Sequence, residues 1–208
     1  MTAAPTSARN KHQLRTEETQ SRILDAAEAI FSEQGFEKTQ LEEVAARAGF
    51  TRGAIYAHYA GKEDLFLALM KRRVLDRFSK VRQFISAEPE QARRPEIFRE
   101  WLHDQAENPT WAMLMLEFKL YVLRRPQSHV KLREMYDLMT NASGDDFIAL
   151  LFGHELDSET RANIERRLSI MGAAVGGAVL ESCIRPELFP APQRRQLLDE
   201  LFSALVRA

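Results

Sequence analysis

The sequence predicts an all-α protein of about nine helices. Apolar residues recur every three or four positions from residue 17 onward, which is the period of an amphipathic helix. Proline and glycine residues interrupt this pattern at intervals of helical length, and no alternating run long enough for a β-strand occurs. With 208 residues, of which 45% are hydrophobic and 28% charged, the chain is large enough for two compact units.

Composition and charge exclude several classes of protein. The net charge of −1 does not by itself indicate a protein that binds a polyanion. Cys183 has no second cysteine to pair with, and the N-terminal region lacks the apolar core of a signal peptide. The longest nearly apolar run, residues 111–123, is shorter than the roughly 18 to 20 residues that a bilayer requires. We therefore expect a cytoplasmic protein with no membrane-spanning segment.

Residues 1–16 differ in composition from the rest of the chain. They carry Arg9, Lys11 and Arg15 but no acidic residue, and the Thr, Ala, Ser and Pro around them cannot form a core. This composition predicts a disordered basic arm. The arm is either an inert solvated terminus or a segment that contacts a phosphate backbone.

A first helix is predicted after Thr16. Glu17 and Glu18 lie where the N-terminal end of a helix favours negative charge, and Gly35 ends the periodic run. The apolar stripe of this helix consists of Ile23, Ala27, Ile30 and Phe31.

Two short helices joined by a tight turn follow. Thr39 and Glu42 have the spacing of a capping box, which opens the first of them. Gly49 closes that helix in a left-handed turn, and Thr51 caps a second helix over residues 52–59. This layout is that of a helix-turn-helix, which presents its second helix to the major groove of DNA. An ordinary αα-hairpin within a bundle explains the same turn.

The outward residues of the second short helix favour the DNA-binding interpretation. With Ile55 as the apolar anchor, the positions left outside include no acidic residue and supply hydroxyl groups, a guanidinium and an imidazole. Gly53 and Ala54 allow the backbone to approach the groove closely. Lys62, at the start of the next helix, adds an ammonium beside free backbone amides. The outward residues are Thr51, Arg52, Gly53, Tyr56, Ala57 and His58.

Residues 51–66, Thr-Arg-Gly-Ala-Ile-Tyr-Ala-His-Tyr-Ala-Gly-Lys-Glu-Asp-Leu-Phe, closely resemble the signature of the TetR/AcrR family of bacterial transcriptional regulators. The resemblance extends back through residues 23–31 and Gly35-Phe36. It implies a homodimer whose three-helix heads read a palindromic double-stranded DNA operator, and a C-terminal body that binds a small molecule and releases the DNA. The chain departs from the family at Gly61, where a serine often caps the next helix.

The resemblance also implies roles for individual residues. The positions that contact phosphates, or support such contacts, correspond to Thr39, Thr51, Tyr56, Tyr59 and Lys62. Those that approach base edges correspond to Arg52, Gly53, Ala54 and His58. Tyr59 is alternatively a core aromatic residue. The implied domains are the arm, a DNA-binding head over residues 17–61, and a ligand-binding and dimerisation domain over residues 62–208.

The rest of the chain is predicted to be helical. A long helix opens at Lys62, and further helices are expected near residues 96–107, 110–124, 127–152, 158–184 and 193–206. Residues 111–123 are apolar on nearly every face, which predicts a buried helix. The family resemblance places an effector cavity among the helices from about residue 80 to 155.

The candidate effector site takes its residues from these helices, and their types suggest an apolar or aromatic ligand. For any single one of them, plain core packing is the better explanation. Glu117 either lies inside, where it favours a cationic ligand, or pairs with a surface base such as Lys119. The candidates are Phe84, Trp101, Trp111, Met115, Glu117, Phe118, Tyr121, Tyr136 and Met139.

Two apolar stripes near the C-terminus are candidates for a homodimer interface, because the family pairs its last two long helices in a four-helix bundle. In a monomer both stripes would instead cover the core. The first stripe consists of Leu168, Met171, Ala174, Val175, Ala178 and Val179. The second consists of Leu197, Leu198, Leu201, Phe202 and Leu205.

Catalytic interpretations find little support. The five histidines are scattered without the spacing of metal ligands, and Cys183 is predicted to be a buried small apolar residue with no histidine partner. We expect no enzyme activity, no catalytic residue, no metal and no cofactor. The predicted function is a ligand-responsive transcriptional regulator, in its simplest form a repressor. The alternative is an interaction protein of the same fold without a small-molecule inducer.

Overall fold

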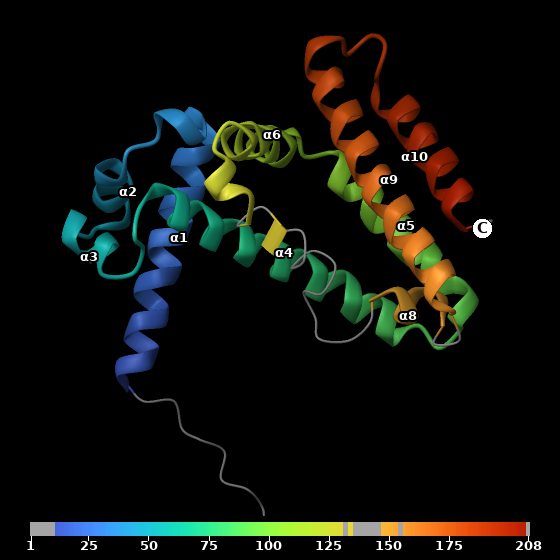
Figure 1. Cartoon of the computed structure of the whole chain (residues 1–208), viewed down its shortest axis with the longest axis horizontal. Helices are drawn as coiled ribbons and strands as arrows, with labels where there is room; N and C mark the ends of the chain where they lie inside the picture. The colour runs from blue at the N-terminus through green and yellow to red at the C-terminus, as the bar shows by residue number, and fades with distance from the viewer. Residues whose placement is uncertain (1–10, 131–132, 135–146, 154–155, 207–208) are drawn as a thin grey trace, which may run out of the picture. The chain divides into compact units, whose positions relative to one another are not determined.

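The computed structural model describes residues 11–130, 133–134, 147–153 and 156–206. In this part of the chain it contains nine α-helices, two short 3-10 helices and no β-strand, which confirms the all-α expectation (Figure 1). The chain divides into two compact units, Met1–Met70 and Lys71–Ala208, which are called the head and the body below.

The head contains α1 (Lys11–Lys38), α2 (Leu41–Ala48), α3 (Arg52–Tyr56) and the first turns of α4 (Lys62–Ala87). Helix α1 begins at Lys11 and so includes the last six residues of the predicted basic arm, and the Thr19 hydroxyl donates to the carbonyl of Arg15. Residues 11–16 are therefore helical, since they contain no residue that breaks a helix; residues 1–10 lie outside the described part. Gly35, with φ of 79°, interrupts α1 as predicted.

The core of the head explains why its boundary falls after Met70 rather than after residue 61. The rings of Phe31 and Phe36 each approach the ring of Phe66 to 4.9 Å between centroids. Phe66 is fully buried, as are Leu65 and Met70. The first two turns of α4 thus complete the core of the head, although the sequence pattern assigns the whole helix to the body.

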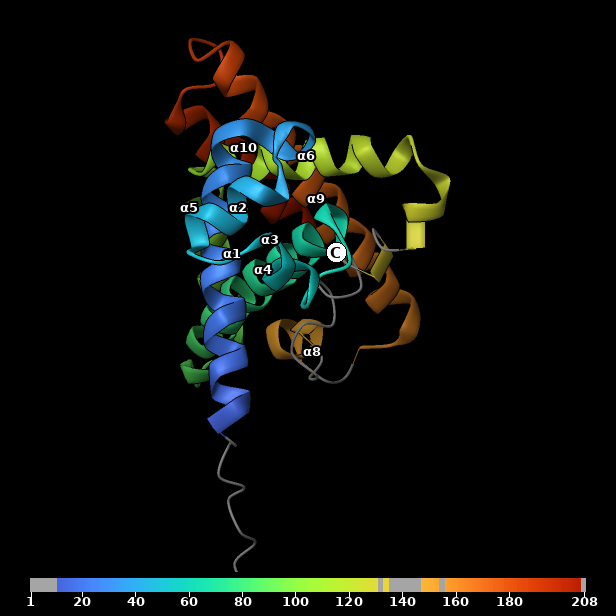
Figure 2. The same ribbon diagram turned by 90° about the vertical axis from the view of Figure 1, so that its left-hand side faces the viewer.

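Helices α2 and α3 lie next to each other in the head (Figure 2) and are connected by a tight turn. Gly49 adopts φ of 75°, and its N–H closes the end of α2 onto the carbonyl of Ala46. Arg22 of α1 donates to the carbonyl of Ala48 at 2.9 Å, and its guanidinium lies 4.7 Å from the centre of the Phe50 ring. This arginine ties the turn to α1 and so fixes the start of α3.

The predicted capping box at the start of α2 is wrong. The N-cap is Gln40, which makes no side-chain capping bond. The Thr39 hydroxyl instead donates to the carbonyl of Gly35 at 2.7 Å. The break at Gly35 leaves that carbonyl without a helical partner, so Thr39 stabilises the end of α1 rather than the start of α2.

The body contains the remainder of α4, then α5 (Arg94–Ala106), α6 (Pro109–Leu123), α8 (Phe147–Phe152), α9 (Ser158–Ile184) and α10 (Ala191–Val206). Short 3-10 helices lie at Gln91–Arg93 and Pro126–Ser128. Much of the helix predicted over residues 127–152 falls outside the described residues. Figure 1 shows α9 and α10 as an antiparallel pair, with α5 beside them.

The core of the body is built around Phe98 of α5. Its ring stacks on Trp101 at 5.5 Å between centroids and meets Phe147 of α8 edge-on at 5.3 Å. Helices α4, α9 and α10 contribute Val81, Met171 and Phe202 among other buried residues. One apolar cluster therefore joins five of the helices of the body.

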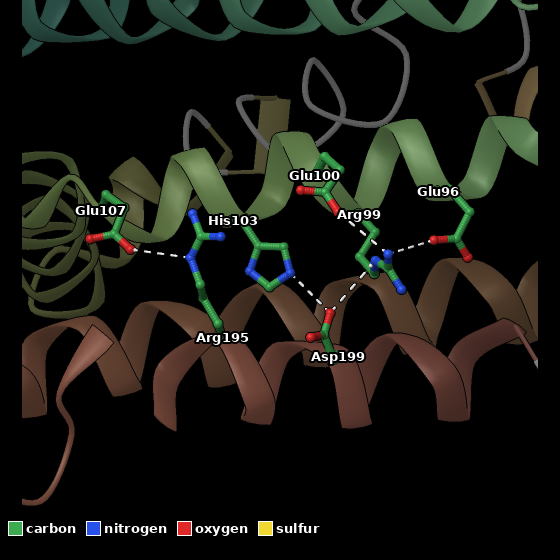
Figure 3. A network of polar contacts seen from close by, with 7 residues as sticks. All are labelled: Glu96, Arg99, Glu100, His103, Glu107, Arg195 and Asp199. Carbon is green, nitrogen blue, oxygen red and sulfur yellow. Dashed lines mark hydrogen bonds and ion pairs between the residues drawn. The ribbon is translucent and has the colours of Figure 1, made fainter. Parts of the chain in front are cut away.

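A network of polar contacts connects α5 to α10 (Figure 3). Nε2 of His103 lies 2.9 Å from Oδ1 of Asp199, and Nε of Arg99 lies 3.6 Å from the same oxygen. The side chain of His103 is only 5% exposed. The sequence pattern identifies this histidine merely as one of several scattered ones; its partner is 96 residues further along the chain.

Candidate nucleic-acid interface

Helix α3 is a short helix with one anchored face. Thr51 forms its N-cap, as predicted, and its hydroxyl oxygen accepts from the N–H of Ala54 at 3.4 Å. Ile55 is fully buried. Because a single buried residue fixes the helix, the remaining residues of α3 are available at the surface of the head.

The structure exposes four of the predicted contact residues on and beside α3: Thr51, Arg52, Gly53 and Tyr56. Tyr56 is 45% exposed. Ala54 and His58 are half-buried. The helix itself carries no acidic residue. This surface presents the hydroxyl groups and the guanidinium expected for contacts with phosphates and base edges, whereas the expected imidazole, that of His58, is half-buried.

Arg52 has two partners in the head. Its Nη1 lies 2.7 Å from Oε1 of Glu42 on α2, and its Nη2 donates to the hydroxyl oxygen of Tyr56 at 3.3 Å. The guanidinium also lies 5.3 Å from the centre of the Tyr56 ring. The pKa of Arg52 is raised by the hydrogen bond to Tyr56 and by the charge of Glu42. The contact between Glu42 and Arg52 was not predicted from the sequence, because only the charges of α3 itself were considered.

Two further predicted contact residues are buried. Thr39 is 2% exposed and its hydroxyl is already donated to Gly35, so it is not presented to a ligand. Tyr59 is 6% exposed and belongs to the core of the head. For Tyr59 the alternative of a core aromatic residue is confirmed, and a direct phosphate contact by either side chain is not supported.

Lys62 binds the end of α1. Its Nζ donates to the carbonyl of Glu37 at 2.7 Å and lies 5.1 Å from the centre of the Phe36 ring. At the same helix start, the carboxylate of Asp64 accepts from the N–H of Ala60 at 3.0 Å. Asp64 therefore ties the residue before Gly61 to the first turn of α4, but it does not replace the capping bond to the first-turn amides that a serine at position 61 would make.

Gly53 has no structural need to be glycine. It is helical, and its φ is not among the positive values of the described residues. A Cβ built at this position would meet only the hydroxyl oxygen of Thr51, at 3.8 Å, which is ordinary van der Waals contact. Glycine weakens a helix relative to alanine, so the fold gains nothing from it here.

A second exposed ion pair in the head joins α2 to α1. Nη1 of Arg47 lies 2.7 Å from Oε2 of Glu33. The hydrogen bond from Arg47 holds the pKa of Glu33 below its usual value. This pair has the same N to O distance as the pair between Glu42 and Arg52, but it involves no residue of α3.

The predicted effector residues that the structure describes do not line one common cavity. Met115 and Phe118 are buried and Trp101 packs on Phe98. Phe84 is 65% exposed, and Glu117 is exposed. An internal position for these two residues is therefore wrong.

Two of the remaining effector candidates are aromatic residues that lie beside arginines. Trp111 lies under the guanidinium of Arg77 at 4.5 Å, and Tyr121 under that of Arg125 at 3.9 Å. Tyr136 and Met139 lie outside the described residues. A small cavity of about 10 Å³ between α5, α9 and α10 has room for about one water molecule and none of these candidates lines it.

The apolar composition of helix α6 suggests burial on all sides, but the structure leaves one side exposed. Leu114, Met115, Phe118 and Val122 are buried, but a second apolar stripe faces solvent in the single chain. That stripe consists of Met113, Leu116, Leu120 and Leu123. The prediction failed because apolar composition fixes how much of a helix can be buried, whereas the neighbouring helices decide which face is covered.

The apolar stripes predicted for a dimer interface mostly face the core of their own subunit. Five of these residues are buried there: Met171, Ala178, Val179, Leu198 and Phe202. Leu168, Val175 and Leu201 pack against the same core, and Leu197 lines the small cavity. Ala174 is half-buried. Leu205 lies in α10, outside the residues whose side chains are described. The alternative that the stripes cover the core is confirmed for the residues that are buried.

A different face of α9 is left uncovered in the single chain. Ile170 is 60% exposed and Ile184 is 75% exposed, and Ala173 and Gly177 between them are exposed. By length and composition alone α9 could also cross a bilayer, since an 18-residue window has a mean hydropathy of 1.3 and only 11% of that window is buried. The expectation of no membrane-spanning segment rested on the longest nearly apolar run, residues 111–123, which does not include this window.

Cys183 is exposed, not buried as predicted, and its thiol lies 3.5 Å from the carbonyl of Val179. Cys183 lies in the last turn of α9, where the neighbouring Ile184 is exposed as well. Within the described residues no group of histidine, cysteine and acidic side chains has the arrangement of a metal site.

Comparisons with known proteins converge on the head. A family model described as bacterial regulatory proteins, tetR family, matches residues 23–69. The transcriptional regulator AcrR of Shigella flexneri is 54% identical over 50 residues, which span 24% of this chain and 23% of AcrR. The activator FasR of Mycolicibacterium smegmatis is 26% identical over 137 residues, spanning 66% of this chain and 62% of FasR.

One solved structure, a complex of SmeT with triclosan, covers 90% of this chain and 91% of SmeT. Its TM-score is 0.55 and its sequence is 25% identical. The alignments with AcrR and FasR cover less than two thirds of the length of each relative. The similarity in sequence is therefore concentrated in the head, while the similarity in fold extends over both units.

Proposed function

We propose that this chain, as a member of the TetR family of bacterial regulatory proteins, is a ligand-responsive transcriptional regulator. It acts in the cytoplasm and binds double-stranded DNA through α3. The observation that carries the proposal is the outer surface of α3. Arg52, Gly53 and Tyr56 are exposed there on a helix without an acidic residue. A helix of this kind fits the major groove, where guanidinium and hydroxyl groups reach base edges and phosphates.

A homodimer is part of this proposal, because two heads related by symmetry read a palindromic operator. The uncovered face of α9, marked by Ile170 and Ile184, supports it. This face is apolar and contains Ala173 and Gly177, whose small size allows a second helix to approach closely. We assign this face to a second copy of the chain rather than to a membrane, since another face of α9 packs against α10.

The dimer is tested by measuring mass in solution with light scattering. Ile170→Glu should convert the dimer to a monomer, because it places a charge in the centre of the apolar face. Leu116→Glu is the matched control: it alters an apolar residue on α6 that is 43% exposed, and it should leave the mass unchanged. Dimers of Ile170→Glu as stable as those of the wild type would contradict this assignment.

A small-molecule effector is the second part of the proposal. SmeT, whose fold is similar, was solved with triclosan, an apolar aromatic compound. The aromatic residues of the body, among them Trp101, Trp111 and Tyr121, are of the type that binds such molecules. An effector must bind the DNA-free state more tightly, by roughly 1 to 3 kcal/mol for typical coupling. A regulator without an effector, acting through a protein partner, is the second candidate.

A thermal-shift screen separates these two candidates. Apolar aromatic compounds, with triclosan as the first probe, are added to the full chain, and each compound that stabilises the protein is then tested for weakened DNA binding. A compound that does both supports an effector site. Stabilising compounds that never weaken DNA binding would favour the protein-partner alternative.

Repression is the mode of regulation that we propose, with release from the operator when the effector binds. The DNA-binding part is tested by selecting duplexes from a randomised pool with the purified full chain. We expect a palindromic site. Arg52→Ala should relax the base preference. Lys62→Ala should weaken binding to all sequences and lower its salt dependence, whereas Tyr56→Phe should weaken binding without lowering the salt dependence, because the phenol is uncharged. A wild-type protein that selects no duplex would contradict the proposal.

A further inference from the structure

The contact between Glu42 and Arg52 lies at the surface of α3 that we propose binds the major groove of DNA. Arg52 is the only basic residue of α3, and its guanidinium is bound by a carboxylate of α2 at 2.7 Å. The hydroxyl of Tyr56 accepts a second N–H from the same guanidinium. Two partners from two helices therefore hold the Arg52 side chain in one orientation.

This contact has little value for the fold. The side chains of Arg52 and Glu42 are 62% and 47% exposed, and ion pairs of this kind contribute little to stability because solvent screens them. Among the described residues, neither side chain makes a hydrogen bond to the core of the head. The arrangement is therefore better explained by what it does to the recognition surface.

The chemical consequence concerns the charge and the donors of Arg52. A guanidinium has five N–H donors, and Glu42 and Tyr56 occupy only part of them. The others remain available for a base edge, and a bidentate pair with O6 and N7 of guanine is the commonest specific contact of arginine. The carboxylate, in contrast, offsets the positive charge, which weakens the attraction of Arg52 to the phosphate backbone.

We propose that Glu42 is a positioning residue that sets sequence specificity: it directs Arg52 toward guanine and reduces its binding to phosphates. This inference rests on the proposed function, because it requires α3 to bind DNA. The inference goes beyond the proposed function because it assigns a role to an acidic residue outside α3. A carboxylate at a DNA-binding surface lowers affinity for every sequence, so its benefit lies in the discrimination between sequences.

The test compares Glu42→Gln with wild type in the full-length protein. The amide keeps the size of the side chain but removes its charge. Affinity for poly(dI-dC), a non-specific duplex, should rise several-fold, and the slope of log K against log salt should steepen by about 0.9, the value for one further neutralised phosphate. The preference for guanine at the position read by Arg52 should fall about fivefold or more.

The chain offers a matched control in Glu33→Gln. This variant also removes one negative charge and releases an exposed arginine, Arg47, from an ion pair of 2.7 Å. Base preference should be unchanged in Glu33→Gln, because Arg47 is not on α3. In an Arg52→Ala background, Glu42→Gln should cause no further change in base preference. Both variants alter exposed side chains, and their folding is checked by thermal unfolding.

The outcomes separate this inference from the proposed function. A wild-type protein that selects no duplex overturns both. A wild-type protein that selects a site, while Glu42→Gln keeps the same preference for guanine, overturns the role of Glu42 alone. An equal loss of preference in Glu33→Gln also overturns it, since the effect would then follow from net charge. The role of Glu42 would also be overturned if Glu42→Gln lowered the preference for guanine equally in the Arg52→Ala background, because Glu42 would then act through a residue other than Arg52.

Discussion

Gly53 provides a test in which stability and DNA binding should change in opposite directions. Gly53→Ala adds one methyl group to the exposed face of α3. The only neighbour within 4 Å of that methyl group is the Thr51 hydroxyl oxygen, at 3.8 Å, so the native backbone accommodates it without strain. Replacing glycine by alanine within a helix stabilises it by about 0.5–1 kcal/mol. For a unit the size of the head, this corresponds to a rise in melting temperature of about 2–8 °C.

The same methyl group should weaken DNA binding. If α3 lies in the major groove, the added group occupies space between the helix backbone and the bases. Overpacking a close contact costs about 1–3 kcal/mol, which corresponds to an increase in Kd of about five- to 150-fold. The increase is measured by fluorescence anisotropy with the selected duplex. Thermal unfolding of the full chain, followed by circular dichroism, measures the gain in stability.

Gly172→Ala is the control for this prediction. Gly172 is also helical and exposed, with no atom within 4 Å of a Cβ built there, but it lies in α9 of the body. It should stabilise the protein by a similar amount and leave DNA affinity unchanged. The reasoning about α3 would be refuted if Gly53→Ala bound the selected duplex as tightly as wild type, or if it destabilised the head.

Three further predictions concern the architecture of each unit. Gly49→Ala should destabilise the head by about 1–2 kcal/mol in urea unfolding, because alanine disfavours the φ of 75° and its Cβ would lie 3.0 Å from Nη2 of Arg22. Asp199→Ala should destabilise the body by about 1–3 kcal/mol, since it removes the hydrogen-bond partner of the buried His103; Asp199→Asn, which keeps an oxygen acceptor, should cost less, and equal losses would argue against the bond. Asp157 caps α9 by accepting from the N–H groups of two residues, and the hydrogen bonds from Thr160 hold its pKa below the ordinary value of 3.8. Its stabilising effect should be complete above pH 3.8 and decline as the pH falls through the lowered pKa, which hydrogen exchange at the first turn of α9 would detect.

Local sequence patterns predicted most of the head. Gly35 and Gly49 were identified as chain breaks, Thr51 as an N-cap and Ile55 as the anchor of α3, and each has that role. These features depend on residues that are close in sequence, so their chemistry can be recognised without a fold. The capping-box prediction failed because the Thr39 hydroxyl had two possible partners. The break at Gly35 made the carbonyl of Gly35 available, and Thr39 donates to that carbonyl.

The site was predicted less completely. The outward set on α3 was correct for Thr51, Arg52, Gly53, Tyr56 and Ala57, whereas His58 is half-buried. Tyr59, to which the family resemblance gave a phosphate contact, is in the core. Glu42 was seen only as a capping residue. Its contact with Arg52 depends on the angle at which α2 and α3 meet, and no spacing within either helix encodes that angle.

The sequence by itself determined the helical class of this protein, the positions of its turns and the residues of α3 that face away from the core. It could do so because helix periodicity and capping are local properties. Only the tertiary structure decided which apolar stripe of α9 is buried, which face of α6 remains exposed, and that His103 meets Asp199. Each of these depends on how helices far apart in the sequence pack, because an apolar stripe records that a face can be buried without specifying its neighbour.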